Sequence, residues 1–145
     1  MTEIAFHFNA PDKLAYACRL LRKAVGSGAR VVVTAGAQEL RALDAALWTY
    51  APLDFLPHCH ASAEPAVLAA SPVMLTEAVP EAPHLQVLVN LGSQVPDGFG
   101  RFERLIEIVG MHDDDRQQAR GRWKHYADRG YAIIRHDLAA RSQNG

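Results

Sequence analysis

Hydrophobic positions along this chain follow two different spacings. Residues 4–8 and 30–34 are short apolar runs typical of buried strands, whereas apolar side chains recur every three or four positions over residues 12–25, which predicts an amphipathic helix. Gly26-Ser27-Gly28 ends that helix, because glycine tolerates the left-handed conformation of a helix cap. A strand, a helix and a strand in this order predict two parallel strands joined by a right-handed crossover.

The rest of the chain continues this alternation of strands and helices. Helices are predicted over 37–48 and 113–129, and strands over 73–76, 85–91, 102–109 and 131–136. Residues 51–83, rich in Pro and Ala, form a looser region around the first of these strands. The pattern predicts an α/β fold with a mostly parallel central sheet, in a single domain over residues 1–138, followed by a frayed tail over 139–145.

Composition and charge exclude some of the functions that a protein with this fold could have. The 145 residues are 49% hydrophobic, which is enough for one domain with a sizeable core. Fifteen basic and sixteen acidic residues give a net charge of −1. This balance argues against a protein that mainly grips nucleic-acid backbone, although it leaves room for a local basic patch. With no long apolar run, no signal-peptide pattern and only two cysteines, we expect a soluble cytoplasmic protein that does not contact a membrane.

Candidate catalytic chemistry is sparse. The first turn between a strand and a helix, Asn9-Ala10-Pro11-Asp12, lacks the glycines of a dinucleotide site, and the chain has no phosphate-binding glycine loop. His58-Cys59-His60 resembles the start of a metal site, but the other histidines have no ligand spacing, so a pair of loop histidines is favoured. Cys59 lacks a recognisable base to activate it. In Asp113-Asp114-Asp115, we expect Asp113 to cap the last helix and the other two to complement its dipole. No catalytic residue, metal or cofactor is predicted.

The second helix presents an aromatic residue away from its apolar stripe. Leu40, Leu43 and Leu47 form the stripe, and Trp48 lies roughly 100° from its middle. Trp48 is therefore either covered by the following loop or presented to a partner, and the sequence leaves both readings open. For Phe55, which follows shortly, a place in the core is favoured.

The last helix gathers cations around an indole. Arg116, Arg120, Trp123 and Lys124 fall within about 100° of arc, either as a solvated basic face or as a binding surface. Gly121 within this helix costs about 1 kcal/mol relative to alanine, which suggests a reason other than helix stability, such as packing. Such a face suits a short acidic peptide with a hydrophobic last residue, because guanidinium binds carboxylate bidentately while the apolar side chain fills a neighbouring pocket.

Four segments of the chain carry a family resemblance: residues 43–48 (LDAALW), 55–58 (FLPH), 102–109 (FERLIEIV) and 119–126 (ARGRWKHY). Together they resemble the chi subunit family of bacterial DNA polymerase III. Their order and spacing match the family from about residue 4 to residue 138. The resemblance implies a three-layer α/β/α Rossmann-like fold and a non-catalytic accessory protein of the clamp loader. It also implies that the protein links the polymerase holoenzyme to single-stranded-DNA-binding protein, through the acidic, phenylalanine-terminated C-terminal tail of that protein.

The resemblance also assigns roles to individual positions, with Arg120 as the choice for the terminal carboxylate of the tail. Trp48 and Phe55 would contact the psi subunit, which bridges chi to the clamp loader, and DNA would be reached only indirectly. Two other functions stay open: a small α/β nucleotide-binding protein or enzyme, and a direct binder of single-stranded DNA in which Trp123 stacks on a base. The implied residues of the tail site are Val109, Arg116, Arg120, Trp123 and Lys124.

Overall fold

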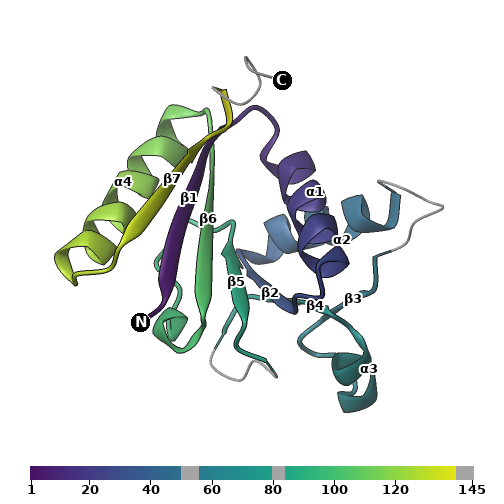
Figure 1. The fold of residues 1–145 in the computed structure, drawn as a ribbon. Coiled ribbons are helices and arrows are strands. Elements are labelled where there is room, and N and C mark those ends of the chain that lie inside the picture. The colour runs from purple at the N-terminus through teal and green to yellow at the C-terminus, as the bar shows by residue number, and fades with distance from the viewer. Residues whose placement is uncertain (50–55, 80–83, 140–145) are drawn as a thin grey trace.

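A seven-stranded parallel sheet organises the chain in the computed structural model, which describes residues 1–49, 56–79 and 84–139. Its strand order is β3-β4-β2-β5-β6-β1-β7, and every pair of neighbouring strands is parallel (Figure 1). The strands are β1 (Glu3–Ala10), β2 (Val31–Thr34), β3 (His58–His60), β4 (Val73–Thr76), β5 (Val87–Asn90), β6 (Arg104–Gly110) and β7 (Ile133–Asp137).

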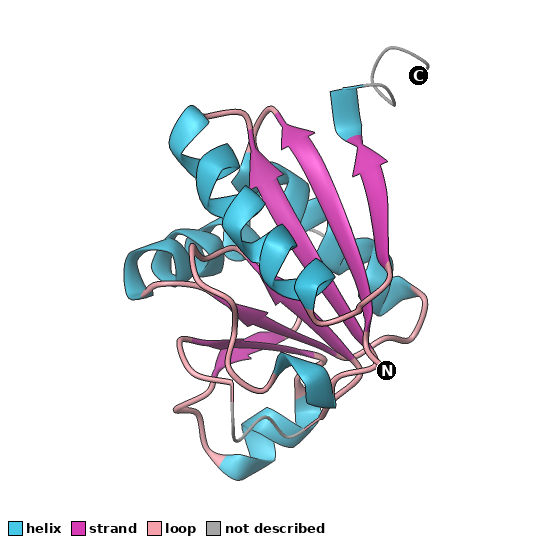
Figure 2. Cartoon of the chain, turned by 90° about the vertical axis from the view of Figure 1, so that its left-hand side faces the viewer, coloured by secondary structure: helices cyan, strands magenta, loops and turns pink. Residues whose placement is uncertain are grey.

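Helices cover both faces of this sheet. On one face lie α1 (Lys13–Gly26) and α2 (Ala37–Thr49), which bury Leu21 and Leu43 against it. The other face carries α4 (Asp113–Asp128), whose Tyr126 packs on Ile4 and Phe6. Figure 2, seen from the α4 side, shows a helix lying along the sheet in front of its longest strands. The predicted three-layer α/β/α fold is confirmed, with a sheet that is parallel throughout. The remaining helical elements are α3 (Pro65–Ala70) and the 3-10 turn η1 (Phe99–Arg101).

The pleat of the two longest strands decides which side chains reach α4. Successive side chains of a strand point to opposite faces of the sheet. On β1, Ile4, Phe6 and Phe8 therefore face α4, and on β6 Leu105 and Val109 do so. The intervening positions of β6 pack instead on the side of α1 and α2. As a result, apolar side chains of β1 and β6 lie beneath the face of α4 that carries its cations.

The looser region that was expected over residues 51–83 contains two short elements that the sequence did not reveal. Within its described part, β3 has only three residues and α3 has six, with Pro65 in the first turn of α3. Both are too short to show a period, and the prolines of this region are typical of loops and turns. The strand predicted at 73–76 is confirmed as β4. Phe55 and residues 140–145 of the expected tail lie outside the described residues.

The predicted cap of the last helix is wrong by one residue. His112 is the N-cap and makes no side-chain capping bond, so Asp113 is the first residue of α4 rather than its cap. The aspartate that ties the start of the helix to the rest of the chain is Asp115, two residues after Asp113. Asp115 accepts hydrogen bonds from the backbone N–H of Gly110, at 2.7 Å, and from Lys13 Nζ, at 3.1 Å, and so holds the turn between β6 and α4. All three aspartates still lie in the first turn, where they complement the helix dipole.

Gly121 has no packing role. A Cβ atom built at this position meets no atom of the described residues within 4 Å, and the residue is exposed on α4. The packing reason expected from the sequence is therefore wrong. Across the described ranges, no helix has the length and apolar character needed to cross a membrane.

Candidate functional site

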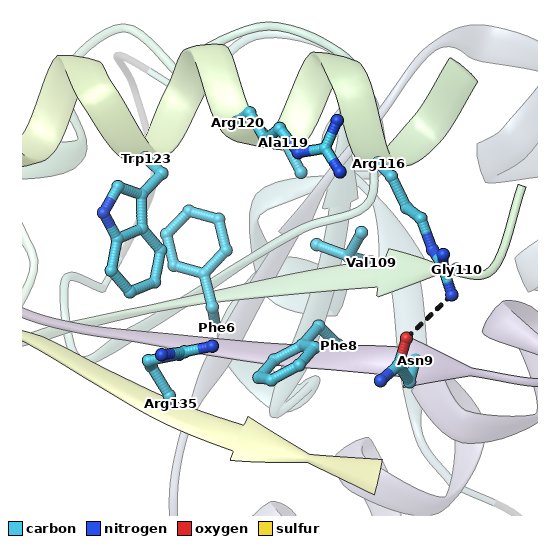
Figure 3. A pocket seen from close by; sticks show the side chains of 10 residues that line it. All are labelled: Phe6, Phe8, Asn9, Val109, Gly110, Arg116, Ala119, Arg120, Trp123 and Arg135. Carbon is cyan, nitrogen blue, oxygen red and sulfur yellow. Dashed lines mark hydrogen bonds between the residues drawn. The ribbon is translucent and has the colours of Figure 1, made fainter. Parts of the chain in front are cut away.

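An open cavity of about 320 Å³ lies between α4 and the strands β1, β6 and β7 (Figure 3). Its inner surface is apolar and partly aromatic, and its rim carries three arginines. Phe6 and Phe8 come from β1, Val109 from β6, and Trp123 from α4. The full lining is Phe6, Phe8, Asn9, Val109, Gly110, Arg116, Ala119, Arg120, Trp123 and Arg135.

Helical and strand periodicities together assemble this cavity. Arg116, Arg120 and Trp123 are spaced by four and three residues, so they share one face of α4. Arg135 lies on β7, far in the sequence from the cavity residues of β1. The parallel register of β1 and β7 pairs Phe6 with Arg135, and paired residues of adjacent strands project to the same face of the sheet. Arg135 therefore faces the cavity from the side opposite α4, as Figure 3 shows.

Aromatic rings form one wall and hold Arg135 in position. The ring centroids of Phe6 and Trp123 lie 4.9 Å apart with the planes tilted by 54°. The guanidinium carbon of Arg135 lies 5.4 Å from the centroid of Phe8 and 5.8 Å from that of Trp123. Cation–π contacts of this length orient the guanidinium without an acidic partner. The cationic head of Arg135 is thus placed at the cavity by two of its lining rings.

Arg116 is fixed by an unusual backbone conformation at the end of β1. Its Nη2 donates a hydrogen bond of 3.0 Å to Asn9 Oδ1, and Asn9 Nδ2 donates to Asp137 Oδ1 at 2.9 Å. Asn9 has a φ of 63°, in the left-handed region that asparagine tolerates better than most residues. The register of β1 against β6 shifts at this point. The departure from regular strand geometry turns the Asn9 amide toward the rim of the cavity.

The charge of the cavity is one-sided. The described lining residues include three arginines and no acidic side chain. Arg120 and Arg135 form no hydrogen bond and no ion pair with any described residue, and the partner of Arg116 is a neutral amide. An anion that enters the cavity would therefore meet guanidinium groups without first displacing a carboxylate. The apolar inner surface, in turn, favours a ligand with a hydrophobic group beside its charge.

A buried polar network outside the cavity lining ties α4 to β5 and β6. Arg122 Nε donates to Glu107 Oε1 at 3.0 Å, and Tyr126 Oη donates to Oε2 at 2.6 Å. Asn90 Nδ2 lies 3.1 Å from both oxygens. Burial raises the pKa of Glu107, and the Arg122 guanidinium opposes this rise. Burial and the Glu107 carboxylate raise the pKa of Tyr126, so its phenol stays protonated and donates.

The structure places most of the expected site residues together. Val109, Arg116, Arg120 and Trp123 all line the cavity, whereas Lys124 is exposed on α4 and is not among the lining residues. Sequence reasoning missed the contributions of β1 and β7, which are Phe6, Phe8, Asn9 and Arg135. The alternation of Phe6 and Phe8 within an apolar strand was a usable signal for β1. No local sequence pattern indicates that Arg135 lines the cavity, because its position depends on the pairing of β7 with β1.

A second surface surrounds Trp48, on the other side of the sheet. The side chain is 57% exposed, and its ring meets the edge of His58 at a centroid distance of 5.5 Å. His58 Nε2 lies 2.9 Å from Asp44 Oδ1, and Nδ1 lies 2.7 Å from the Leu56 carbonyl oxygen. Both imidazole nitrogens are therefore engaged with the chain itself. Among the described residues, no three His, Cys, Asp or Glu side chains are grouped to hold a metal ion.

The fold and the cavity define a three-layer parallel α/β protein with a cationic, aromatic-lined pocket at one edge of its sheet. Residues 1–134 match the family described as DNA polymerase III chi subunit, HolC. The DNA polymerase III subunit chi of Pseudomonas aeruginosa is 32% identical over 143 residues, which cover 95% of this chain and 98% of that protein. The chain therefore belongs to the DNA polymerase III chi subunit family, whose role is in DNA replication. The resemblance carried by the four sequence segments is confirmed.

Proposed function

We propose that this chain is a non-catalytic accessory subunit of DNA polymerase III that binds the acidic, phenylalanine-terminated C-terminal tail of single-stranded-DNA-binding protein. The observation that carries the proposal is the lining of the cavity, which combines three arginines with aromatic rings and has no acidic side chain among its described residues. Membership of the chi family supports a role in the replication machinery. DNA is then reached through a bound partner, which agrees with the net charge of −1.

The two halves of such a ligand match the two halves of the cavity. The terminal phenylalanine ring packs on the apolar surface formed by Phe8, Val109 and Ala119, in a volume of about 320 Å³ that suits a small ligand group. The C-terminal carboxylate accepts hydrogen bonds from Arg120, with Arg116 beside it. Charge-assisted contacts between guanidinium and carboxylate are stronger than neutral ones. Lys124, exposed one turn further along α4, faces acidic residues that precede the phenylalanine.

The surface around Trp48 is the proposed contact for the psi subunit, which connects chi to the clamp loader. Trp48 is a large aromatic residue that stays mostly exposed, and such residues are enriched at the centres of protein interfaces. Trp48 belongs to α2, which together with α1 covers the face of the sheet opposite α4 and the cavity (Figure 1). One chain can therefore hold both partners at once, in the cytoplasm where replication takes place. Phe55, the second expected contact, lies outside the described residues.

Fluorescence anisotropy of a labelled acidic peptide ending in phenylalanine tests the proposal. We expect saturable binding with a Kd of micromolar order, or about −8 kcal/mol, that weakens as salt rises because the contacts are largely ionic. Arg120→Ala should abolish most of this affinity. Arg19→Ala is the matched control, because it removes an exposed arginine from the opposite face of the sheet. Absence of binding by the unaltered protein contradicts the function, and full affinity in Arg120→Ala contradicts the site.

Direct binding of single-stranded DNA is the second candidate. Trp123 is only half-buried and lies beside three arginines, an arrangement in which a base can stack while phosphates are neutralised. A gel shift with the purified protein alone separates the two functions. A shifted band at micromolar protein supports the DNA reading, and an unshifted oligonucleotide under conditions where the peptide binds supports the tail reading.

A further inference from the structure

Arg135 occupies a place in the cavity that the arginines of α4 do not share. It belongs to β7, the last strand of the sheet in the described structure, and it faces the cavity from across Phe6 and Phe8 (Figure 3). The two arginines of α4 line the opposite wall. Any peptide whose last residue fills the space between the walls has cations on both sides. Among the described residues, no strand lies beyond β7 to close the cavity at this edge of the sheet.

We propose that Arg135 is a specificity-determining residue that reads the acidic side chains upstream of the terminal phenylalanine, separately from Arg120, which holds the terminal carboxylate. This inference rests on the proposed function. A chain that leaves the cavity across the open edge at β7 passes the Arg135 guanidinium one or more residues before its end. The carboxylate of an Asp or Glu side chain there accepts hydrogen bonds from this guanidinium.

The surroundings of Arg135 prepare it for this role. Its guanidinium contacts two rings of the cavity, at 5.4 Å and 5.8 Å, and it has no ion-pair partner among the described residues. Planar guanidinium groups stack on aromatic faces while their N–H donors stay available at the edge of the plane. The arginine is therefore oriented before a ligand arrives, so less side-chain entropy is lost when a carboxylate binds.

Another arginine in this chain provides a matched control. Arg19 on α1 also lies over an aromatic ring, with its guanidinium carbon 5.7 Å from the centroid of Tyr16. It is exposed, as Arg135 is, but it lies on the opposite face of the sheet and does not line the cavity. Replacing either residue by alanine removes one positive charge, together with one cation–π contact for Arg19 and two for Arg135. Only the replacement of Arg135 changes the cavity.

The test is a double-mutant cycle between protein and peptide, read by anisotropy with the full chain. One peptide is acidic and ends in phenylalanine; in the other, every upstream Asp and Glu is replaced by Asn and Gln. We expect Arg135→Ala to weaken binding of the acidic peptide about fivefold, as for an exposed ion pair, and binding of the amide peptide less than twofold. Arg120→Ala should weaken both peptides by a similar factor, because both keep the terminal carboxylate. Arg19→Ala should change neither by more than twofold.

The outcomes separate the inference from the function on which it rests. Equal losses for the two peptides in Arg135→Ala, or no loss for either, overturn the inference while leaving the proposed function intact. Failure of the unaltered protein to bind the acidic peptide overturns both. Arg135→Gln, which keeps most of the stem without the charge, should reproduce the selective loss. Unchanged thermal midpoints for both variants show that a loss of affinity is not a loss of fold.

Discussion

The ion pair beneath α4 gives the most demanding prediction about stability. Arg122 and Glu107 have side chains that are 2% and 0% exposed, and Arg122 Nε lies 3.0 Å from Glu107 Oε1. Replacing Arg122 with methionine keeps an apolar stem of similar length and removes the charge. The Glu107 carboxylate then retains the donors of Tyr126 and Asn90 but loses Arg122, its one cationic partner among the described residues.

The expected cost follows from leaving one charge buried without compensation. Breaking a buried ion pair by removing one partner costs about 3–5 kcal/mol. Folded domains are stable by about 5–15 kcal/mol, so Arg122→Met should remove a large part of the free energy of unfolding. Urea denaturation followed by circular dichroism measures this loss. The double variant Glu107→Gln with Arg122→Met should recover much of it, since no unpaired charge remains.

Two results would refute this reasoning. A loss below about 1 kcal/mol in Arg122→Met would mean that the pair behaves like an exposed salt bridge. A double variant as unstable as the sum of its single variants would mean that the two side chains are not coupled. The loop at Ser93 and Gln94 is held by the same network, because Arg122 Nη1 donates to the Ser93 carbonyl oxygen at 3.2 Å and Asn90 Nδ2 donates to that of Gln94. This loop should therefore loosen when the ion pair is broken.

Three further predictions concern single residues. Gly121→Ala should raise the free energy of unfolding by up to about 1 kcal/mol without changing peptide affinity, because the added methyl group meets no described residue and lies outside the cavity lining; destabilisation in a urea melt would contradict this. Trp48→Ala should weaken capture of purified psi subunit while leaving the thermal midpoint nearly unchanged, and a large drop in the midpoint would show that the indole belongs to the core. Burial and Arg30 lower the pKa of His84, so the unfolded chain takes up its proton first as pH falls below about 6.5. Stability should therefore decrease from pH 7.5 to pH 5.5 less steeply in His84→Gln than in the unaltered protein, and equal slopes in urea titrations would contradict this.

Local patterns were sufficient for the part of the site that lies on one element. Arg116, Arg120 and Trp123 share a face because helix periodicity operates over a few residues, and the sequence alone placed them together. Arg135 could not be found in this way. Its position beside Phe6 depends on which strand pairs with β1, and that pairing joins the two ends of the chain. Contacts of such long sequence separation are set by the whole sheet.

Arg122 shows that a charged residue of a helix cannot be assigned to the surface from its polar neighbours alone. Arg122 stands among Arg120, Lys124 and other polar residues, so the sequence gives it the look of a surface residue. In the structure it is buried, because Glu107, flanked on both sides by apolar residues of its strand, needs a charged partner. A carboxylate between apolar neighbours at 105–109 was the available signal. The same strand therefore supplies both Val109 to the cavity and Glu107 to the network that positions α4 over it.

The two tryptophans allow the central claim to be tested with one spectrum. The chain contains only Trp48 and Trp123, one on each proposed surface, so a ¹H–¹⁵N correlation spectrum shows one indole signal for each. Unlabelled acidic peptide ending in phenylalanine is titrated into the ¹⁵N-labelled protein, and Trp123→Phe assigns the signals. The account predicts that the Trp123 signal shifts and saturates while the Trp48 signal stays in place. A Trp123 signal that does not move at saturating peptide, or a saturating shift of Trp48 alone, would contradict the binding of the tail in this cavity.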